Sequence, residues 1–325
     1  MAKATLTATV LETGDAQRWE QLAQAHGTLF DSTRWTDLFG PNLRRLGLYD
    51  RGGTLRGGFC VYEQRRLGLR ILRNPPFTRQ IGPFYAPKAS NPSAIVSEMR
   101  GVVEAMAKYL DEEKAAVLSL GLSLGIDDGL PFRWRGYKVI PHYTYRLDLN
   151  QSEDALFSAL AKEKRNDIRK AQQDGIEVLK ANDTRSMREL VTHSFARQKK
   201  ALPHGALATI LNAFAPGSSA YCYVAHDQQR PVAGVYIVHD AHCAYYLLGG
   251  YAQGAHHGAG AYAMLQAIHH AKALGLATFD FEGSVIQAIE RYFRAFGGTL
   301  TPVLGVHKAW FPIECALKLR RREIF

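Results

Sequence analysis

The chain has 325 residues, enough for two ordinary domains, and 46% of them are hydrophobic while 22% are charged. This composition is typical of a folded globular protein, and no run approaches the roughly 18 uninterrupted apolar residues of a membrane-spanning helix. Lys and Arg outnumber Asp and Glu by 40 to 30, so the net charge is +10. Such an excess favours an anionic partner, such as a phosphorylated cosubstrate, RNA or an anionic membrane surface, or else is a generic solubilising charge.

The four cysteines are scattered along the chain without the spacing of metal ligands. The sequence therefore predicts neither a disulfide framework nor a metal site, and it favours a reducing cytoplasm. The first 15 residues lack a charged segment followed by an apolar one, so no secretory signal is predicted. The basic end "LKLRRREIF" leaves a peripheral membrane association open, and the oligomeric state is not predicted.

The first half of the chain predicts mixed α and β structure. Two short helices are expected at 18–27 and 31–39, followed by two strands, "RRLGLYD" and "LRGGFCVYEQR", on either side of a glycine turn. After a loop rich in Pro and Gly, Asn91-Pro92 opens a long helix, and a buried strand at 115–123 follows it.

The second half repeats this order of helix, strand meander, helix and strand. A helix is expected at 152–175, three strands lie between 220 and 251, and a helix at 260–275 leads into the strand "ATFDFEGS". Residues 48–62 also align without gaps on 224–238, which places Gly58 on Gly234. We therefore predict an internal duplication and two domains of similar structure, 1–145 and 146–325.

Two segments of the second half are candidates for binding phosphate groups. In "YAQGAHHGAGAYAMLQ" a glycine-rich loop with His257, Gly258 and Gly260 precedes a helix, and backbone N–H groups at such a helix start can bind an anion. In the basic helix "AKEKRNDIRKAQQ", Arg165 and Arg169 share one face. The alternatives are a flexible connection for the loop and a solvated helix face with local ion pairs for the helix.

The segment "FDFEGSVIQAIERYFRAFGG" places carboxylates at the end of a strand. Glu282 is a candidate general base, with a structural role in the turn as its alternative. Tyr292 on the following helix is either a candidate acid or a residue that packs the helix. For Asp280 the alternative of capping the turn, or of pairing with Arg291 or Arg294, is favoured. No phosphate-binding P-loop, dinucleotide fingerprint, nucleophile elbow or catalytic cysteine context is found, so covalent catalysis is not predicted.

Together, "YRLDLNQSEDALFSALAKEKRNDIRKAQQDGIEV", "RQKK", "GAGAYAMLQAIHHAKALGLATFDFEGS" and "ERYFRAFGG" resemble the GNAT-fold acyltransferase superfamily. Within it they are similar to the branch related to Fem-type peptidoglycan bridge aminoacyltransferases. "FDSTRW", "LRGGFCVYEQR" and "NPPFTRQIGPFY" extend the resemblance to the first half. It implies an α+β fold of two tandem GNAT-like domains, each with a mixed, mainly antiparallel sheet flanked by helices.

The resemblance implies acyl transfer to an amine by direct attack, from acyl-coenzyme A or aminoacyl-tRNA as co-substrate and without a metal. The acceptor, a small molecule or a peptide, would lie in a cleft between the domains, with Arg34, Trp35, Tyr251 and Asp280 among its contacts. Two departures stand out. Ala255 occupies the position where the usual GNAT phosphate loop has Arg or Gln, and no long helical hairpin interrupts the second half.

Three functions follow from these observations. The first is an acyl-coenzyme A-dependent N-acyltransferase. The second is an aminoacyl-tRNA-dependent transferase that acts on a peptide or a peptidoglycan precursor, which the positive charge suits. The third is a protein that binds ligands without catalysis, which the residue at Ala255 favours.

Overall fold

The computed structural model describes residues 6–217 and 219–319 and divides the chain into two compact units. The first comprises Met1–His142 together with Pro302–Phe325, and the second comprises Tyr143–Thr301. Sequence analysis placed the division at 145/146 and assigned the whole C-terminal part to the second domain. The C-terminal part instead returns to the first unit, because strand β13 (Thr299–Ala309) pairs with β6 (Val117–Gly121) there.

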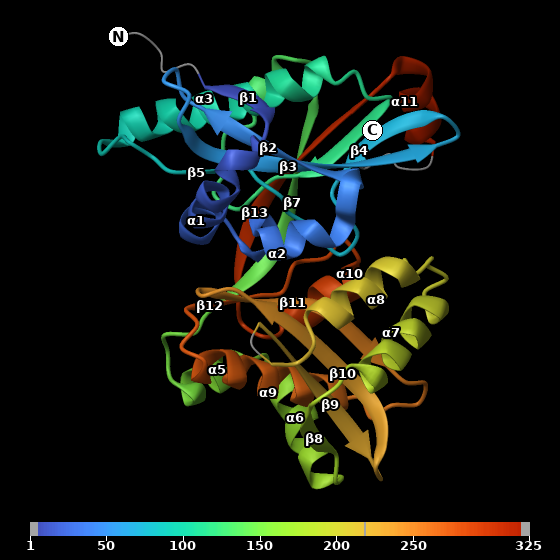
Figure 1. Cartoon of the computed structure of the whole chain (residues 1–325). Coiled ribbons are helices and arrows are strands. Elements are labelled where there is room, and N and C mark those ends of the chain that lie inside the picture. The colour runs from blue at the N-terminus through green and yellow to red at the C-terminus, as the bar shows by residue number, and fades with distance from the viewer. Residues whose placement is uncertain (1–5, 218, 320–325) are drawn as a thin grey trace. The chain divides into compact units, whose positions relative to one another are not determined.

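The first unit contains a sheet in the order β1-β2-β3-β4-β6-β13, with β5 added beside β3. Its pairs are antiparallel except β4 with β6, which is parallel. The other strands are β1 (Thr7–Val10), β2 (Leu43–Tyr49), β3 (Leu55–Arg66), β4 (Leu69–Arg73) and β5 (Phe84–Tyr85). The helices are α1 (Ala16–His26), α2 (Thr33–Thr36), α3 (Pro92–Glu112), α4 (Leu130–Arg133) and α11 (Phe311–Lys318), with short 3-10 turns at Thr13–Asp15, Leu29–Asp31 and Asp37–Asn42 (Figure 1).

Helix α3 shows why the predicted elements form where they do. As predicted, the Asn91 side chain caps the helix by accepting a hydrogen bond from the Ala94 amide at 2.9 Å, and Pro92 fills the first turn, where no amide donor is needed. Val102, Met106 and Leu110 repeat at intervals of four residues and are buried against the sheet.

The second unit contains a sheet in the order β7-β12-β11-β10-β9-β8, in which β11 and β12 are parallel and the other pairs are antiparallel. Its strands are the end of β7 (Lys138–Asp148) with β8 (Glu177–Ala181), β9 (Ala220–Asp227), β10 (Arg230–His239), β11 (Cys243–Tyr251) and β12 (Thr278–Asp280). Its helices are α5 (Glu153–Ala159), α6 (Lys162–Gln173), α7 (Arg185–Arg197), α8 (His204–Ala213), α9 (Ala259–Ala273) and α10 (Gln287–Arg294) (Figure 1).

Helices α7 and α9 cover opposite faces of the second sheet. Gly234 on β10 faces α7, since a Cβ there would lie 3.0 Å from the Met187 sulfur. Tyr221 on β9 points to the other face, where its hydroxyl donates to the Ala267 carbonyl of α9 at 2.9 Å. The sheet is therefore buried on both sides, as its long apolar strands indicate.

The internal duplication is visible in the packing as well as in the order of elements. The strands β2 and β3 correspond to β9 and β10 at the predicted offset, and Gly58 and Gly234 occupy equivalent positions. A Cβ at Gly58 would lie 2.2 Å from the Trp19 ring of α1. Gly234 makes the equivalent close contact with Met187 of α7. In both units a helix thus packs at a glycine of the second strand of the corresponding pair. The mixed α/β class and the tandem arrangement predicted from the sequence are confirmed.

Candidate active site

The candidate site of the second unit begins where the parallel strands β11 and β12 part. Their pairing ends at Tyr245 with Asp280, and β11 continues to Tyr251 while β12 stops. The register between β10 and β11 shifts at this level and leaves Leu247 as an extra residue, which is a β-bulge. Bulges bend strands and re-aim side chains, and they are frequent beside active sites.

Three tyrosines gather beyond this point. Tyr246 and Tyr251 come from β11, and Tyr292 comes from α10, which follows β12. The Tyr292 hydroxyl oxygen is buried, although its ring is partly exposed. Burial raises the pKa of Tyr292 well above the ordinary tyrosine value, and the neighbouring Tyr251 and Tyr246 add to this shift. Tyr292 is therefore a neutral phenol at physiological pH, able to donate a proton.

The backbone of Tyr251 is fixed by α7. Its amide donates to the Ser194 hydroxyl at 2.9 Å, and Ser194 is buried. Its ring lies against the start of α9, because a Cβ at Gly260 would lie 2.0 Å from the Tyr251 hydroxyl oxygen. Gly260 is thus required by the close approach of this tyrosine.

Helix α6 contributes Lys164, which sequence analysis noted in the basic helix but did not assign to the site. Its ammonium nitrogen lies 5.1 Å from the centroid of the Tyr292 ring, and its side chain is 14% exposed. It pairs with Asp167 at 3.2 Å, and the other oxygen of Asp167 lies 3.4 Å from His257 Nε2. The signal was present in the sequence, because Lys164 shares the buried stripe of α6 with Ile168 and Ala171 at positions i, i+4 and i+7.

The glycine-rich loop before α9 is held by carboxylates of α6. His256 Nε2 lies 3.1 Å from Asp174 Oδ2, and its ring stacks on that of His257. A Cβ at Gly258 would lie 2.0 Å from the Asp167 carbonyl oxygen, so this glycine also meets a packing requirement. The backbone at the start of α9 is that of a helix N-terminus. The Gly258 amide already donates to His256 Nδ1 at 3.1 Å, and the Ala259 amide donates to the His256 carbonyl at 3.0 Å. The fit of this helix start to a phosphate therefore rests on its other N–H groups and on His257, since the open sides of both glycines are filled by protein.

Asp280 and Glu282 differ in their surroundings. Asp280 is fully buried and accepts hydrogen bonds from the Thr144 hydroxyl at 2.5 Å and from the Glu282 amide at 2.8 Å. The Arg146 guanidinium lies 3.4 Å away. Asp280 thus organises the turn after β12, which is the alternative that sequence analysis favoured.

Glu282 is buried and has a φ of 57°, in the left-handed region that side chains other than glycine rarely adopt. Gly283 follows in the same region, and a Cβ there would lie 2.0 Å from the Tyr143 carbonyl oxygen. Such strain costs a side chain of order 1–2 kcal/mol and occurs preferentially at functional sites. Of the two carboxylates in the predicted site, Asp280 and Glu282, Glu282 is the one with this strained backbone conformation.

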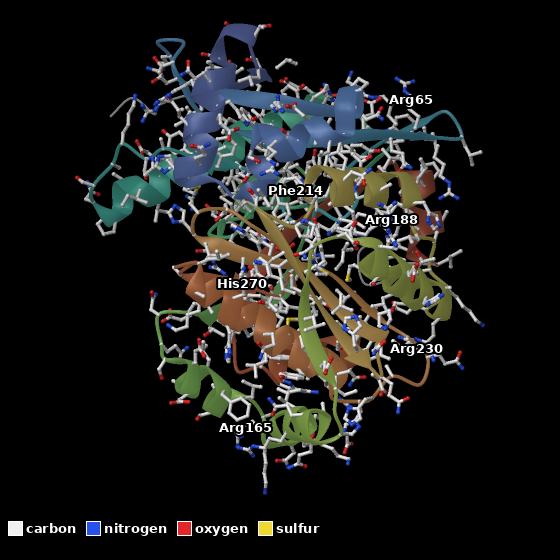
Figure 2. The ribbon with its side chains drawn as sticks, turned by 60° about the horizontal axis from the view of Figure 1, so that its bottom comes forward. Arg65, Arg165, Arg188, Phe214, Arg230 and His270 are labelled. Carbon is white, nitrogen blue, oxygen red and sulfur yellow. The ribbon has the colours of Figure 1, made fainter. Side chains whose placement is uncertain are left out.

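The arginines of the basic helix have structural contacts in the second unit. Arg165 donates to the Ser158 and Leu160 carbonyls at the end of α5 at 2.7 and 2.5 Å, and Arg169 lies 5.4 Å from the centroid of the Phe157 ring. Figure 2 shows Arg165 on the α5–α6 segment. Both side chains join α6 to α5, and their predicted role in phosphate binding remains a prediction.

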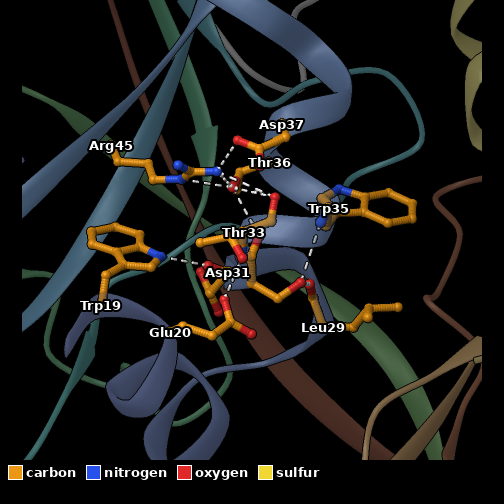
Figure 3. Close-up of polar contacts among 10 residues, drawn as sticks. Trp19, Glu20, Leu29, Asp31, Thr33, Trp35, Thr36, Asp37 and Arg45 are labelled. Atoms are coloured by element: carbon orange, nitrogen blue, oxygen red, sulfur yellow. Dashed lines mark hydrogen bonds and ion pairs between the residues drawn. The ribbon is translucent and has the colours of Figure 1, made fainter. Parts of the chain in front are cut away.

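Arg34 and Trp35 belong to the first unit, and Trp35 lies in the network of Figure 3. Trp35 is fully buried, packs edge-on against Phe30 and donates to the Thr78 hydroxyl at 3.0 Å, while Arg34 is exposed. The buried Trp35 is an anchor of its unit. The predicted acceptor contacts of both residues remain predictions.

The described residues contain no group of three or more His, Cys, Asp or Glu side chains arranged to hold a metal ion. Nor does any helix in the described part of the chain have the length and apolar character needed to cross a membrane.

Comparison with known protein families gives a match within the second unit. Residues 158–294 match the acetyltransferase (GNAT) domain family, whereas no curated protein shows a significant sequence match to the chain. The fold is similar to that of FemX, with a TM-score of 0.67, 13% identity, and coverage of 95% of this chain and 99% of that one.

Two further solved structures share the fold. The structure of L-PGS from Bacillus licheniformis has a TM-score of 0.55 and 11% identity, with 95% and 96% of the two chains covered. A tandem GNAT protein from the clavulanic acid biosynthesis pathway has a TM-score of 0.54 and 11% identity, with 94% and 98% covered. Residues 158–294 of the second unit thus match a GNAT domain, and the chain as a whole shares the fold of FemX and of the tandem GNAT protein.

Proposed function

We propose that the protein is an N-acyltransferase that transfers an acyl group from acyl-coenzyme A to an amine by direct attack. The observation that carries the proposal is the neutral, buried phenol of Tyr292 beside the parting strands, on the helix that follows Glu282. The domain match to acetyltransferases supports the choice of donor. The acceptor is a small molecule or a peptide with a free amine.

In the proposed reaction Glu282 removes a proton from the acceptor, and Tyr292 gives a different proton to the leaving group. The Glu282 carboxylate takes a proton from the acceptor ammonium, and the free amine attacks the thioester carbonyl carbon. The C–N bond forms, the C–S bond breaks, and Tyr292 gives its proton to the leaving sulfur before it recovers one from solvent. The raised pKa of Tyr292 keeps the proton on the phenol until the thiolate develops.

The remaining residues of the site position these two groups. Lys164 lies over the Tyr292 ring and, through Asp167, is connected to His257 on the loop before α9. We place the donor phosphates at the backbone of this helix start, with His257 as the adjacent side chain. Tyr251 remains the proposed acceptor contact in the second unit, while the fully buried Asp280 holds the turn that carries Glu282.

Aminoacyl-tRNA is the second candidate donor, and one observation favours it. Its leaving group is a ribose hydroxyl, which is a much weaker acid than a thiol. An acid whose pKa is raised well above 10 transfers its proton more favourably to such an alkoxide than to a thiolate. The third candidate, a protein that binds without catalysis, predicts ligand binding without turnover of either donor.

Titrations of acetyl-coenzyme A, charged tRNA and uncharged tRNA at two salt concentrations test these alternatives. Saturable binding of acetyl-coenzyme A supports the first proposal, and a salt-sensitive preference for charged tRNA supports the second. Turnover is then measured with Glu282→Gln. A rate and pH profile unchanged from the native enzyme would contradict the role of Glu282 as base.

A further inference from the structure

A second group of basic side chains lies at the opposite end of helix α9 from the glycine-rich loop. Lys180 comes from β8, His239 from β10 and His270 from the last turn of α9 (Figure 2 labels His270). The Lys180 ammonium nitrogen lies 3.3 Å from His270 Nε2. Three elements that are distant in sequence thus bring nitrogen donors together on the face of the second sheet that α9 covers.

Two tyrosines of β9 form the wall of this group. The His270 ring lies 4.5 Å from the Tyr221 ring and 5.8 Å from the Tyr223 ring, measured between centroids. The His239 ring lies 6.1 Å from that of Tyr221. Tyr221 is buried and tied to α9, so the imidazoles rest on a rigid surface.

The group is basic, and within the described part of the chain no ion pair joins a carboxylate to Lys180, His239 or His270. Burial lowers the pKa of His270, and the charges of Lys180 and His239 lower it further. The other basic side chains of the last turns of α9 contact oxygen atoms of residues outside this group. His269 lies 3.5 Å from Glu153, and Lys272 donates to the Leu149 carbonyl at 3.2 Å.

A helix C-terminus attracts cations, and this explains a histidine in the last turn of α9. It does not explain Lys180 and His239, which come from strands and oppose the charging of His270. While His270 is neutral, its Nε2 accepts a hydrogen bond from the Lys180 ammonium. A bound anion would favour the charged form of His270, and both nitrogens could then donate to the anion.

We propose that Lys180, His239 and His270 form an oxyanion site that binds a phosphate group, either on an RNA backbone or on a phosphorylated small molecule. Helix α9 has 15 residues and so spans about 22 Å, which separates this site from the donor loop at its start. The site therefore adds a phosphate contact away from the reacting centre. The proposal of this site does not depend on the proposed acyl transfer.

The proposal is tested by NMR titration of the His270 imidazole with inorganic phosphate and with uncharged tRNA. Bound phosphate is expected to raise the pKa of His270 by about one unit, because an adjacent anion favours imidazolium. In parallel, tRNA affinity is measured against salt for the native protein, Lys180→Ala and the double variant Lys180→Ala/His270→Gln. Lys108→Ala, which removes an exposed lysine from α3 of the first unit, is the charge-matched control.

For each phosphate interaction that a variant removes, the slope of log affinity against log salt is expected to fall by about 1, while Lys108→Ala leaves it unchanged. An effect confined to tRNA assigns the site to an RNA backbone, and an effect confined to inorganic phosphate assigns it to a small ligand. If the pKa of His270 stays constant with both probes and the slopes of the variants equal that of the control, the proposal is wrong. Acetyl transfer to a small amine is expected to be native in Lys180→Ala, so a failure of acyl transfer is measured separately.

Discussion

Replacing Glu282 with glycine is expected to stabilise the second unit while it abolishes acyl transfer. The residue has a φ of 57°, a conformation that costs a side chain about 1–2 kcal/mol and costs glycine almost nothing. Glycine also adds freedom to the unfolded chain, which offsets about 0.5–1 kcal/mol of the gain. The net stabilisation is therefore between about 0 and 1.5 kcal/mol.

Glu282→Gln is the matched control, because it removes the carboxylate and keeps the strained backbone. It is expected to lose activity by about 100-fold or more, as for the removal of a general base, without a gain in stability. The two variants together separate the chemical role of the side chain from the conformational cost of its position.

The assay has to follow the second unit by itself. All four tryptophans lie in the first unit, so their fluorescence reports on that unit alone. Hydrogen exchange of the amides of β10 and β11 measures the opening free energy of the second unit instead. Destabilisation of Glu282→Gly by more than about 1 kcal/mol, or activity of Glu282→Gln within twofold of native, would refute the reasoning.

Two further predictions concern a pair of equivalent glycines and one carboxylate. Gly58→Ala is expected to destabilise the first unit by about 1–3 kcal/mol, because the new Cβ would lie 2.2 Å from a rigid tryptophan ring. Gly234→Ala is expected to destabilise the second unit less, because its Cβ would lie 3.0 Å from a flexible methionine, and equal losses in the two units by hydrogen exchange would contradict this. Burial raises the pKa of Glu113, but hydrogen bonds from Arg44 and Arg70 outweigh it and bring the pKa to about 2. A lowered pKa contributes stability above the unfolded value of 4.5 that is lost as the pH falls toward 2, so urea unfolding followed by tryptophan fluorescence should show a decline over this range that Glu113→Gln lacks.

The sequence predicted the features that depend on local patterns. The cap of α3, the helix after the glycine-rich loop and the duplicated strand pair all follow from spacing and from residue type. The assignment of Gly258 and Gly260 shows the limit of such reasoning. A glycine that a ligand approaches and a glycine that a neighbouring side chain approaches look the same in a sequence, and here the neighbours are Asp167 and Tyr251.

What the sequence did not predict depends on contacts between distant segments. The tyrosine cluster joins β11 to α10, and the return of the C-terminal part to the first unit depends on the pairing of β13 with β6. Lys164 is intermediate between these cases. A lysine on the buried stripe of an otherwise polar helix was visible in the sequence, but its partner Tyr292, more than 100 residues away, was not.

The acid role of Tyr292 gives a test that separates the two donors. A thiol has a pKa near 8.5, so a thiolate leaves without full protonation, whereas a ribose alkoxide needs a proton as it departs. Tyr292→Phe keeps the ring under Lys164 and removes only the hydroxyl. We expect kcat to fall by about 10-fold or less with acetyl-coenzyme A and by about 100-fold or more with aminoacyl-tRNA. Single-turnover rates with both donors measure the ratio, and an unchanged rate with each of them would show that Tyr292 is a packing residue and that the leaving group takes its proton from elsewhere.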